Sequence, residues 1–385
     1  MFQDLMQVHL DRLLFKRKIQ RVNKQTDMNK FTLVAILSLC VVIISTSCDT
    51  KDPKGEETTH CPCFDRDFPT GEDLLKIPDW KKAESSFVGI KSISFENFPV
   101  LDGSTSASAL NTMISCKLLG IGYRWLPPPV SGGEWILQTN YDDVPKQYDY
   151  NAGDNAFFGN RVMTSQTHGA FMNLINKKAD IILTHRTISP DEKAHADSLG
   201  VTLIETSIAL DAFVFVVNRD NPVKSLTVDQ IQKIYTKEIT NWSQVGGNNA
   251  DMKVFIRPRN SGSEEVFRTL VMNGLEPADF PETSVSQMFA VFLEVTENVN
   301  SICYTFNNYK DVIARKNCNE VPVIAINGIC PNENTVKNKT YPLISEVHVA
   351  IRSDLDHSSM AYKLYEWLQS ENVKYTITEC GFLPE

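Results

Sequence analysis

The sequence has a deficit of positive charge. Its 385 residues contain 38 Lys and Arg against 47 Asp and Glu, which gives a formal net charge of −9. The first 47 residues hold seven basic and three acidic side chains, so the remainder carries 31 basic against 44 acidic ones. A body this acidic argues against nucleic acid as a partner. Any anion must therefore be bound by local geometry rather than by the overall field.

Motifs of common enzyme classes are also missing. The sequence contains no Gly-x-x-x-x-Gly-Lys-Ser/Thr phosphate loop, no Gly-x-Ser-x-Gly elbow, no Ser-x-x-Lys nucleophile motif and no His-Glu-x-x-His zinc motif. No set of nucleophile, base and orienting group is visible in the sequence. We therefore expect a protein that is not an enzyme and has no catalytic residues, no cofactor and no metal site.

Long hydrophobic runs are scarce, and the one at the N-terminus is short. Residues 31–44 follow Lys30 and end in Ser45-Thr46-Ser47-Cys48. This run is too short for a comfortable membrane span but fits a signal-peptide core. The pattern resembles a bacterial lipoprotein signal, with residues 1–47 removed and lipid such as palmitate on Cys48. Residues 1–27 would then precede the true start; a long basic n-region or a plain membrane anchor is the alternative.

Nine cysteines are present, and their pairing cannot be read from the sequence. Cys40 leaves with the signal and Cys48 would carry lipid, so an odd number remains: Cys61, Cys63, Cys116, Cys303, Cys318, Cys330 and Cys380. An oxidising compartment permits disulfides. Cys61-Pro62-Cys63 with His60 beside it is a weak metal candidate, because no second ligand pair accompanies it.

The most informative pattern covers residues 252–267. Val254 and Ile256 alternate as in a half-buried strand, Ser261-Gly262-Ser263-Glu264 has the form of a capping box, and apolar residues continue at helical spacing. Free N–H groups and the dipole at a helix start favour negative charge. Arg257 closes the strand and offers a fork of donors for a tetrahedral oxyanion. The pattern predicts an anion site, although an ordinary turn with solvated arginines fits it equally well.

Two further hydroxyl-rich turns precede predicted helices. A strand-like stretch at 98–101 leads into Asp102-Gly103-Ser104-Thr105-Ser106, and Ser165-Gln166-Thr167-His168 leads into the other helix. Three such helix starts could aim neutral donors at one point. None is specific alone, because Gly-Ser turns are common.

The rest of the chain alternates between strand and helix patterns. Residues 48–85 are polar and indicate a tether. We expect strands near 87–101, 180–184 and 208–218, and helices at 106–119, 169–178, after Thr227 and at 360–368. Residues 120–165, with Pro127-Pro128-Pro129, are typical of a long inserted loop. This alternation predicts an α/β fold with a largely parallel sheet.

Several stretches are similar to one known family. They are Ile208-Ala209-Leu210-Asp211, the segments 217–223 and 238–247, Ser301-Ile302-Cys303-Tyr304 and the final Cys380-Gly381-Phe382-Leu383-Pro384. In order and spacing, from about residue 87 to 385, the chain resembles the type II periplasmic binding proteins. The likeness is strongest to the phosphate-binding proteins of phosphate ABC importers.

The resemblance implies a two-lobed periplasmic-binding-protein-like fold (type II). Two crossover strands, near 209–212 and 343–349, would join the lobes, with the ligand cleft between them. Lobe one would comprise residues 86–209 and 346–385, and lobe two residues 210–345. Closure of the lobes would trap the ligand and present a new surface to a permease.

The resemblance also implies the ligand-binding residues. The first loop would contribute Ser104, Thr105 and Ser106, the second Thr167, and the third Arg257, Ser261, Gly262 and Ser263. Asn260 stands where the family has Gly, a mild departure because Asn tolerates unusual backbone angles.

Two further departures concern selectivity. Some members have an Asp after the strand equivalent to 181–184 and an acidic residue where Arg259 stands; this chain has His185 and then Arg186 after that strand. A carboxylate acceptor excludes fully deprotonated anions such as sulfate, so discrimination between phosphate and sulfate is open here. We include His185 and Arg186 among the expected ligand residues, because a neutral imidazole accepts and a protonated one donates. A surface imidazole and a structural ion pair are the alternatives.

These inferences predict a monomeric lipoprotein of the bacterial cell envelope, facing the periplasm or exterior. It would capture inorganic phosphate or a similar oxyanion for an ABC permease. The alternative is a sensor or scavenger with the same fold that binds another oxyanion or an organic anion without a dedicated permease. A secreted hydrolase is the third hypothesis, and no catalytic set supports it. Affinity, permease identity and membrane leaflet cannot be read from the sequence.

Overall fold

The computed structural model describes residues 60–62, 77–127, 134–282, 288–315 and 320–385. All of them belong to one unit, Thr58–Glu385. The predicted signal region, Cys48 and most of the predicted tether lie outside the described residues. Among the helices that the structure describes, none combines the length and the apolar character needed to cross a membrane.

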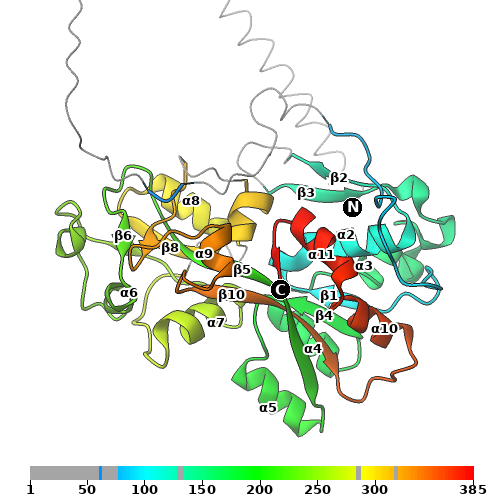
Figure 1. Ribbon diagram of the computed structural model, residues 1–385. Helices are drawn as coiled ribbons and strands as arrows, with labels where there is room; N and C mark the ends of the chain where they lie inside the picture. The colour runs from blue at the N-terminus through cyan, green and yellow to red at the C-terminus, as the bar shows by residue number, and fades with distance from the viewer. Residues whose placement is uncertain (1–59, 63–76, 128–133, 283–287, 316–319) are drawn as a thin grey trace, which may run out of the picture. The chain divides into compact units, whose positions relative to one another are not determined.

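A mixed sheet with strand order β1-β4-β10-β5-β8-β7 is central to the fold, and β11 pairs with β5 (Figure 1). In it β1 runs parallel to β4 and β7 runs parallel to β8, whereas β10 is antiparallel to both β4 and β5, and β5 is antiparallel to β8 and β11. The prediction of a largely parallel sheet is therefore wrong. The bounds are β1 Leu101–Gly103, β4 Ile181–Thr184, β5 Leu203–Val217, β7 Lys253–Val254, β8 Ser301–Phe306, β10 Ile344–Arg352 and β11 Leu383–Pro384.

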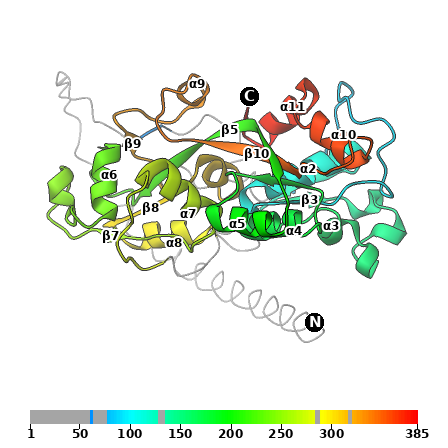
Figure 2. The ribbon, with the colours of Figure 1, turned by 90° about the horizontal axis from the view of Figure 1, so that it is seen from below.

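The strands β5 and β10 explain the difference, because these two long strands pair antiparallel with each other in the middle of the sheet. Ala212 pairs with Ile344 and Ala209 with Val347, and the register shifts between Val347 and His348. Both strands extend between the group of helices α2, α10 and α11 and the side of α6 and α9, and they run in opposite directions (Figures 1 and 2). They are the two crossover strands of a two-lobed α/β fold.

Two large hydrophobic cores lie along these strands. One contains residues of β1, α2, α10 and α11 together with Ile208 and Ala209. The other contains β5 from Leu210 onward, residues of α6, β8 and α8, and Cys61. The chain therefore passes from one core to the other between Ala209 and Leu210. The indole of Trp125 is partly buried and packs against both cores.

The predicted helices form within a few residues of their expected bounds, and Thr227 caps α6 in a capping box with Gln230. Helix α11, which follows α10, was not predicted. The bounds are α2 Ser108–Leu119, α3 Phe157–Asn160, α4 Gln166–Ile175, α5 Pro190–Ser198, α6 Val228–Tyr235, α7 Gly262–Val266, α8 Ala290–Glu297, α9 Glu333–Lys337, α10 Met360–Trp367 and α11 Glu371–Glu379.

Two segments differ from the prediction. In the stretch predicted as a strand near 87–101, ladder pairing starts only at Leu101, because the preceding residues form turns; the Asn97 amide, for example, bonds Ser94 N and Ser92 O. Phe98 is nevertheless fully buried, which accounts for its strand-like pattern. The predicted loop 120–165 contains an antiparallel pair, β2 (Tyr123–Leu126) and β3 (Ile136–Thr139). The small parallel pair β6 (Ser225–Leu226) and β9 (Ala325–Ile326) completes the strands.

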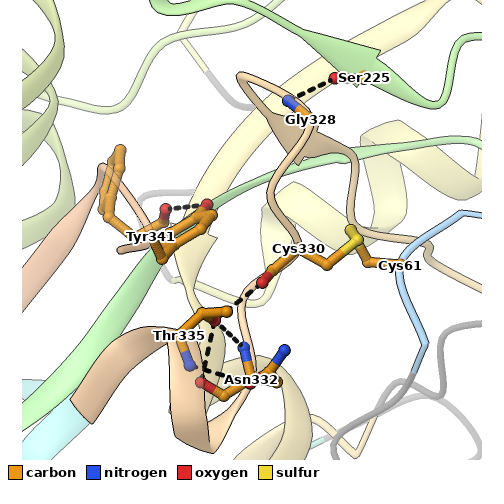
Figure 3. The surroundings of a disulfide bond; sticks show 8 residues. Cys61, Ser225, Gly328, Cys330, Asn332, Thr335 and Tyr341 are labelled. Carbon is orange, nitrogen blue, oxygen red and sulfur yellow. Dashed lines mark hydrogen bonds between the residues drawn. A yellow bond between two sulfur atoms is a disulfide. The ribbon is translucent and has the colours of Figure 1, made fainter. Parts of the chain in front are cut away.

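A disulfide joins Cys61 to Cys330 across 269 positions of sequence (Figure 3). Cys61 is buried, and its N–H donates to Val323 O at 3.1 Å. This pairing removes Cys61 from the suggested metal site with Cys63, which lies outside the described residues, as does Cys318. Cys116, Cys303 and Cys380 are buried free thiols.

Candidate functional site

A cavity of about 410 Å³ lies where the three predicted turns meet. Eight predicted residues line it: Ser104, Thr105, Ser106, Thr167, Arg257, Ser261, Gly262 and Ser263. The rest of the wall comes from Glu134, Thr164, Gln166, His168, Pro258, Arg259, Asn260, Met288 and Phe306. Hydroxyl groups and one buried arginine thus converge from parts of the chain that belong to different cores.

Asp102 ties the first two turns together. Its Oδ1 accepts from Gly103 N at 2.7 Å and from Ser165 N at 2.9 Å, and its Oδ2 accepts from Asn173 Nδ2 at 2.8 Å. Asp102 is fully buried in the middle of β1, two positions before the first cavity residue, Ser104. The carboxylate therefore fixes the start of α4 relative to the turn that carries Ser104.

The second and third turns are in direct contact. A β-carbon built on Gly262 would lie 2.7 Å from Thr167 Oγ1, closer than real β-carbons approach such an atom. Thr167 belongs to α4 and Gly262 opens α7. Only glycine allows these two segments to approach this closely.

Arg257 is the buried cation of the site, with 2% exposure. Its backbone N–H donates to Glu264 Oε2 at 3.1 Å and to the Tyr304 hydroxyl oxygen at 3.0 Å. Burial lowers the pKa of the guanidinium, partly opposed by Cys303, Tyr304 and Glu264. Arginine stays protonated in proteins, so the cavity wall keeps a positive charge with a planar fork of donors.

Glu264 does not complete the predicted capping box. Ser261 Oγ accepts from Glu264 N at 3.3 Å, as expected of an N-cap, but the Glu264 carboxylate turns inward. It accepts from Arg257 N, from the Tyr304 hydroxyl and from Arg268 Nε. Burial raises the pKa of this carboxyl, and its donors oppose that effect. Glu264 thus holds the Arg257 backbone in place.

The residues between Arg257 and Ser261 match the predicted turn. Asn260 has φ 65°, a left-handed conformation that Asn adopts more readily than most residues. Arg259 is exposed, and its Nη2 lies 3.8 Å from Glu276 Oε2. The turn therefore buries one of its two arginines in the cavity wall and leaves the other, which also lines the cavity, exposed to solvent.

His185 and Arg186 do not line the cavity, although both were expected to touch the ligand. The Arg186 guanidinium forms two bonds with the Glu192 carboxylate, at 2.7 and 2.8 Å, and its Nη2 also lies 3.4 Å from Asn260 O. It is a buried structural ion pair that links α5 to the third turn. For Arg186, the alternative of a structural ion pair therefore matches the observed position better than a role in ligand binding does.

His185 lies directly behind Ser106. Its Nδ1 is 2.7 Å from Ser106 Oγ, and its Nε2 is 3.5 Å from Asp211 Oδ2. The imidazole is 1% exposed and packs against the rings of Phe306 and Phe382. The structure thus aligns a hydroxyl, an imidazole and a carboxylate whose order was not apparent in the sequence, because the three residues lie far apart along the chain.

Glu134 is the cavity carboxylate that the sequence analysis missed. It precedes β3 in the segment that the sequence predicts to be a loop, where no periodic pattern marks it. Its Oε1 accepts from the Tyr309 hydroxyl, and burial raises its pKa. An acidic side chain beside an anion site bears directly on selectivity.

Comparison with known proteins identifies the family and agrees with the fold. The family model described as the PBP superfamily domain matches residues 159–372. The phosphate-binding protein PstS of Bacillus subtilis is 24% identical over 196 residues, which are 50% of this chain and 61% of that protein. PstS of Borreliella burgdorferi is 23% identical over 261 residues, 66% of this chain and 88% of that protein.

Among solved structures, an ABC-type phosphate transport receptor from Vibrio cholerae has the same fold. It superposes with a TM-score of 0.50 at 21% identity and covers 74% of this chain and 98% of its own. The match with the Bacillus relative spans about three fifths of that protein's length. Because the family model covers more than half of the sequence, the chain belongs to the PBP superfamily.

Proposed function

We propose that this protein is a substrate-binding protein that captures inorganic phosphate in the cavity and delivers it to an ABC permease. The observation that carries the proposal is the convergence of Arg257 with hydroxyls from three separate turns on one cavity. Charge-assisted hydrogen bonds contribute about 1.5–3 kcal/mol each, so several of them can hold a dehydrated oxyanion. The names of the PstS relatives agree with this ligand.

The direct ligand set of the proposal is smaller than the one predicted from the sequence. It comprises Ser104, Thr105, Ser106, Thr167, Arg257, Ser261, Gly262 and Ser263, all of which line the cavity. His185 and Arg186 support this set from behind. No turnover is part of the proposed role.

The remaining parts of the proposal concern the lobes and the cell envelope. Residues 86–209 and 346–385 would move as one lobe and residues 210–345 as the other, in keeping with the two hydrophobic cores. Closure around phosphate would create the surface that the permease recognises. A lipid on Cys48 would hold the monomer at a membrane, outside the cytoplasm.

The test is phosphate binding by the purified full chain in calorimetry, with Arg257→Ala as the site variant. Removal of the guanidinium takes away two or more charge-assisted bonds, so we expect affinity to fall by roughly 100-fold or more. Arg219→Ala is the matched control, because Arg219 is exposed and pairs with Asp220 away from the cavity. Absence of phosphate binding in the wild type, or equal binding by Arg257→Ala, contradicts the proposal.

A larger anion is the second candidate, because the cavity is generous for one phosphate. Its 410 Å³ falls in the range of about 300–1,000 Å³ typical of small organic ligands. A sensor or scavenger of a phosphonate or a small carboxylate would use the same arginine. Thermal-shift ranking of phosphate, sulfate, phosphonates and carboxylates separates the candidates, since bound ligand raises the melting temperature according to its affinity.

A further inference from the structure

A chain of four side chains leads from the cavity wall to the crossover strand β5. Ser106 Oγ lies 3.1 Å from Ser104 Oγ and 2.7 Å from His185 Nδ1. His185 Nε2 faces Asp211 Oδ2 at 3.5 Å. Ser104 and Ser106 line the cavity, whereas His185 and Asp211 are buried behind them. The position of the protons in this chain decides what the two serines can offer to an anion.

When His185 is neutral, each hydrogen bond of the chain is donated away from the cavity, from Ser104 to Ser106 and from Ser106 to His185. Nε2 makes no hydrogen bond with the described residues, but the Asp211 carboxylate 3.5 Å away attracts a hydrogen placed on Nε2, which favours that tautomer. Nδ1 then accepts the single hydrogen of Ser106, and Ser104 must be the donor in the Ser104–Ser106 bond. Both hydroxyl oxygens therefore present lone pairs to the cavity.

Protonation of His185 reverses the direction in which the hydrogen bonds of the chain are donated. The imidazolium donates from Nδ1 to Ser106, and its positive charge lies beside the Asp211 carboxylate, 3.5 Å from Nε2. Ser106 can then donate to Ser104, and Ser104 can donate to a bound anion. The same four side chains thus offer acceptors in one protonation state and a donor in the other.

Among the described residues, His348 is a further titratable group that interacts with His185. His348 on β10 faces it, and Glu346 Oε2 lies 3.5 Å from His348 Nε2. Burial lowers the pKa of His348, Glu346 opposes this, and His185 lowers it further. The Phe306 and Phe382 ring centroids lie 4.4 and 5.3 Å from the imidazole centroid. Among the carboxylates of the described residues, Asp211 is the one that lies within ion-pair distance of the imidazole.

We propose that the Ser104–Ser106–His185–Asp211 chain distinguishes protonated from fully deprotonated oxyanions in the cavity. This inference rests on the proposed function. With neutral His185 the serine oxygens accept the O–H of a protonated tetrahedral anion such as hydrogen phosphate. Sulfate has no hydrogen to give and meets lone pairs, which costs affinity. His185 is a positioning residue that acts through Ser106.

Sulfate is the probe that tests this chain, because it carries no proton that titrates between about pH 5.5 and 8.5, where histidine changes charge. In calorimetry with the full chain we expect sulfate affinity to rise roughly tenfold as the pH falls across that range, the equivalent of one favourable hydrogen bond gained. His185→Asn keeps an amide near the position of Nδ1 but does not titrate, so its sulfate affinity should be nearly flat with pH.

Two further variants complete the experiment. His348→Asn is the matched control and should keep the wild-type pH dependence, because His348 lies outside the chain. Ser106→Ala interrupts the chain by another route and should abolish the pH dependence even if His185→Asn fails to fold. Thermal melts establish which variants are folded.

The outcomes separate this inference from the proposed function. If the wild type fails to bind phosphate at neutral pH, both are wrong. If it binds phosphate but its sulfate affinity is independent of pH, or folded His185→Asn keeps the full dependence, only the chain is wrong. Hydrolysis of p-nitrophenyl phosphate that Ser106→Ala abolishes would instead make Ser106 and His185 a nucleophile and its base.

Discussion

Gly262 determines how closely two walls of the cavity approach each other. Its missing side chain leaves space for Thr167 Oγ1, which would lie 2.7 Å from a β-carbon. Thr167 cannot retreat easily, because it is 4% exposed and belongs to α4, whose start is held by Asp102. One methyl group at position 262 must therefore separate the third turn from the second.

We expect Gly262→Ala to weaken phosphate binding by roughly tenfold, since misplaced donors lose most of a charge-assisted hydrogen bond. Calorimetry of a double-mutant cycle with Thr167→Ala assigns the cause. Because Thr167→Ala removes the oxygen that the methyl meets, Gly262→Ala should cost clearly less in that background. Equal costs in the two backgrounds would show that steric conflict with Thr167 is not the reason.

Among the elements, the β2–β3 pair joins the two cores beside the cavity. Trp135 N donates to Ile313 O at 2.7 Å, and the Arg315 guanidinium carbon lies 3.4 Å from the Trp135 ring centroid. Burial lowers the pKa of Arg315 to about 10, so it remains a cation at neutral pH and can bind the indole face. Glu134 precedes β3, and its carboxylate accepts a hydrogen bond from the Tyr309 hydroxyl. The pair thus brings a carboxylate to the cavity and anchors it on the opposite core.

Glu134 should make the stability of the protein depend on pH. Burial raises the pKa of its carboxyl in the folded state, so folding favours the protonated form and is opposed once the group ionises. We expect Glu134→Gln to raise the melting temperature near pH 8. The gain should shrink as the pH falls through the folded pKa and vanish at about pH 4, near the ordinary value. A gain of constant size in melts across this range would rule out ionisation of Glu134 as its cause.

The sequence predicted elements where local pattern and tertiary packing agree. The cap at Thr227 and the run from Ile208 to Val217 formed as expected, because capping and strand burial depend on neighbouring residues. Strand direction was predicted wrongly, because the pairing of β5 with β10 depends on residues far apart in the sequence. Glu134 was missed for the same reason: its position depends on Tyr309, which comes from a distant segment. The turn that carries Arg257 could be predicted because its pattern is local, and the structure places Arg257 in the cavity wall.

At the scale of the whole molecule, the Cys61–Cys330 disulfide attaches the start of the described chain to the larger core. The bond closes a loop with a sequence separation of 269 residues, and Cys61 packs in the same core as Val323 and Tyr341. A disulfide stabilises mainly by restricting the unfolded chain, and the effect grows slowly with loop length. A persistent bond of this kind also requires an oxidising compartment, in agreement with the proposed location outside the cytoplasm.

We expect reduction of this disulfide to cost about 2–5 kcal/mol of the free energy of unfolding, because a long loop regains its freedom in the unfolded state. Thermal melts of the full chain with and without dithiothreitol measure the loss as a fall of several degrees in the melting temperature. The double variant Cys61→Ser/Cys330→Ser should melt at the temperature of the reduced wild type and should not respond to dithiothreitol. A response that persists in the double variant would reveal another disulfide, and a wild type that ignores dithiothreitol at its melting temperature would contradict the stabilising role. Phosphate binding should survive in the double variant, since Cys61 and Cys330 lie outside the residues that line the cavity.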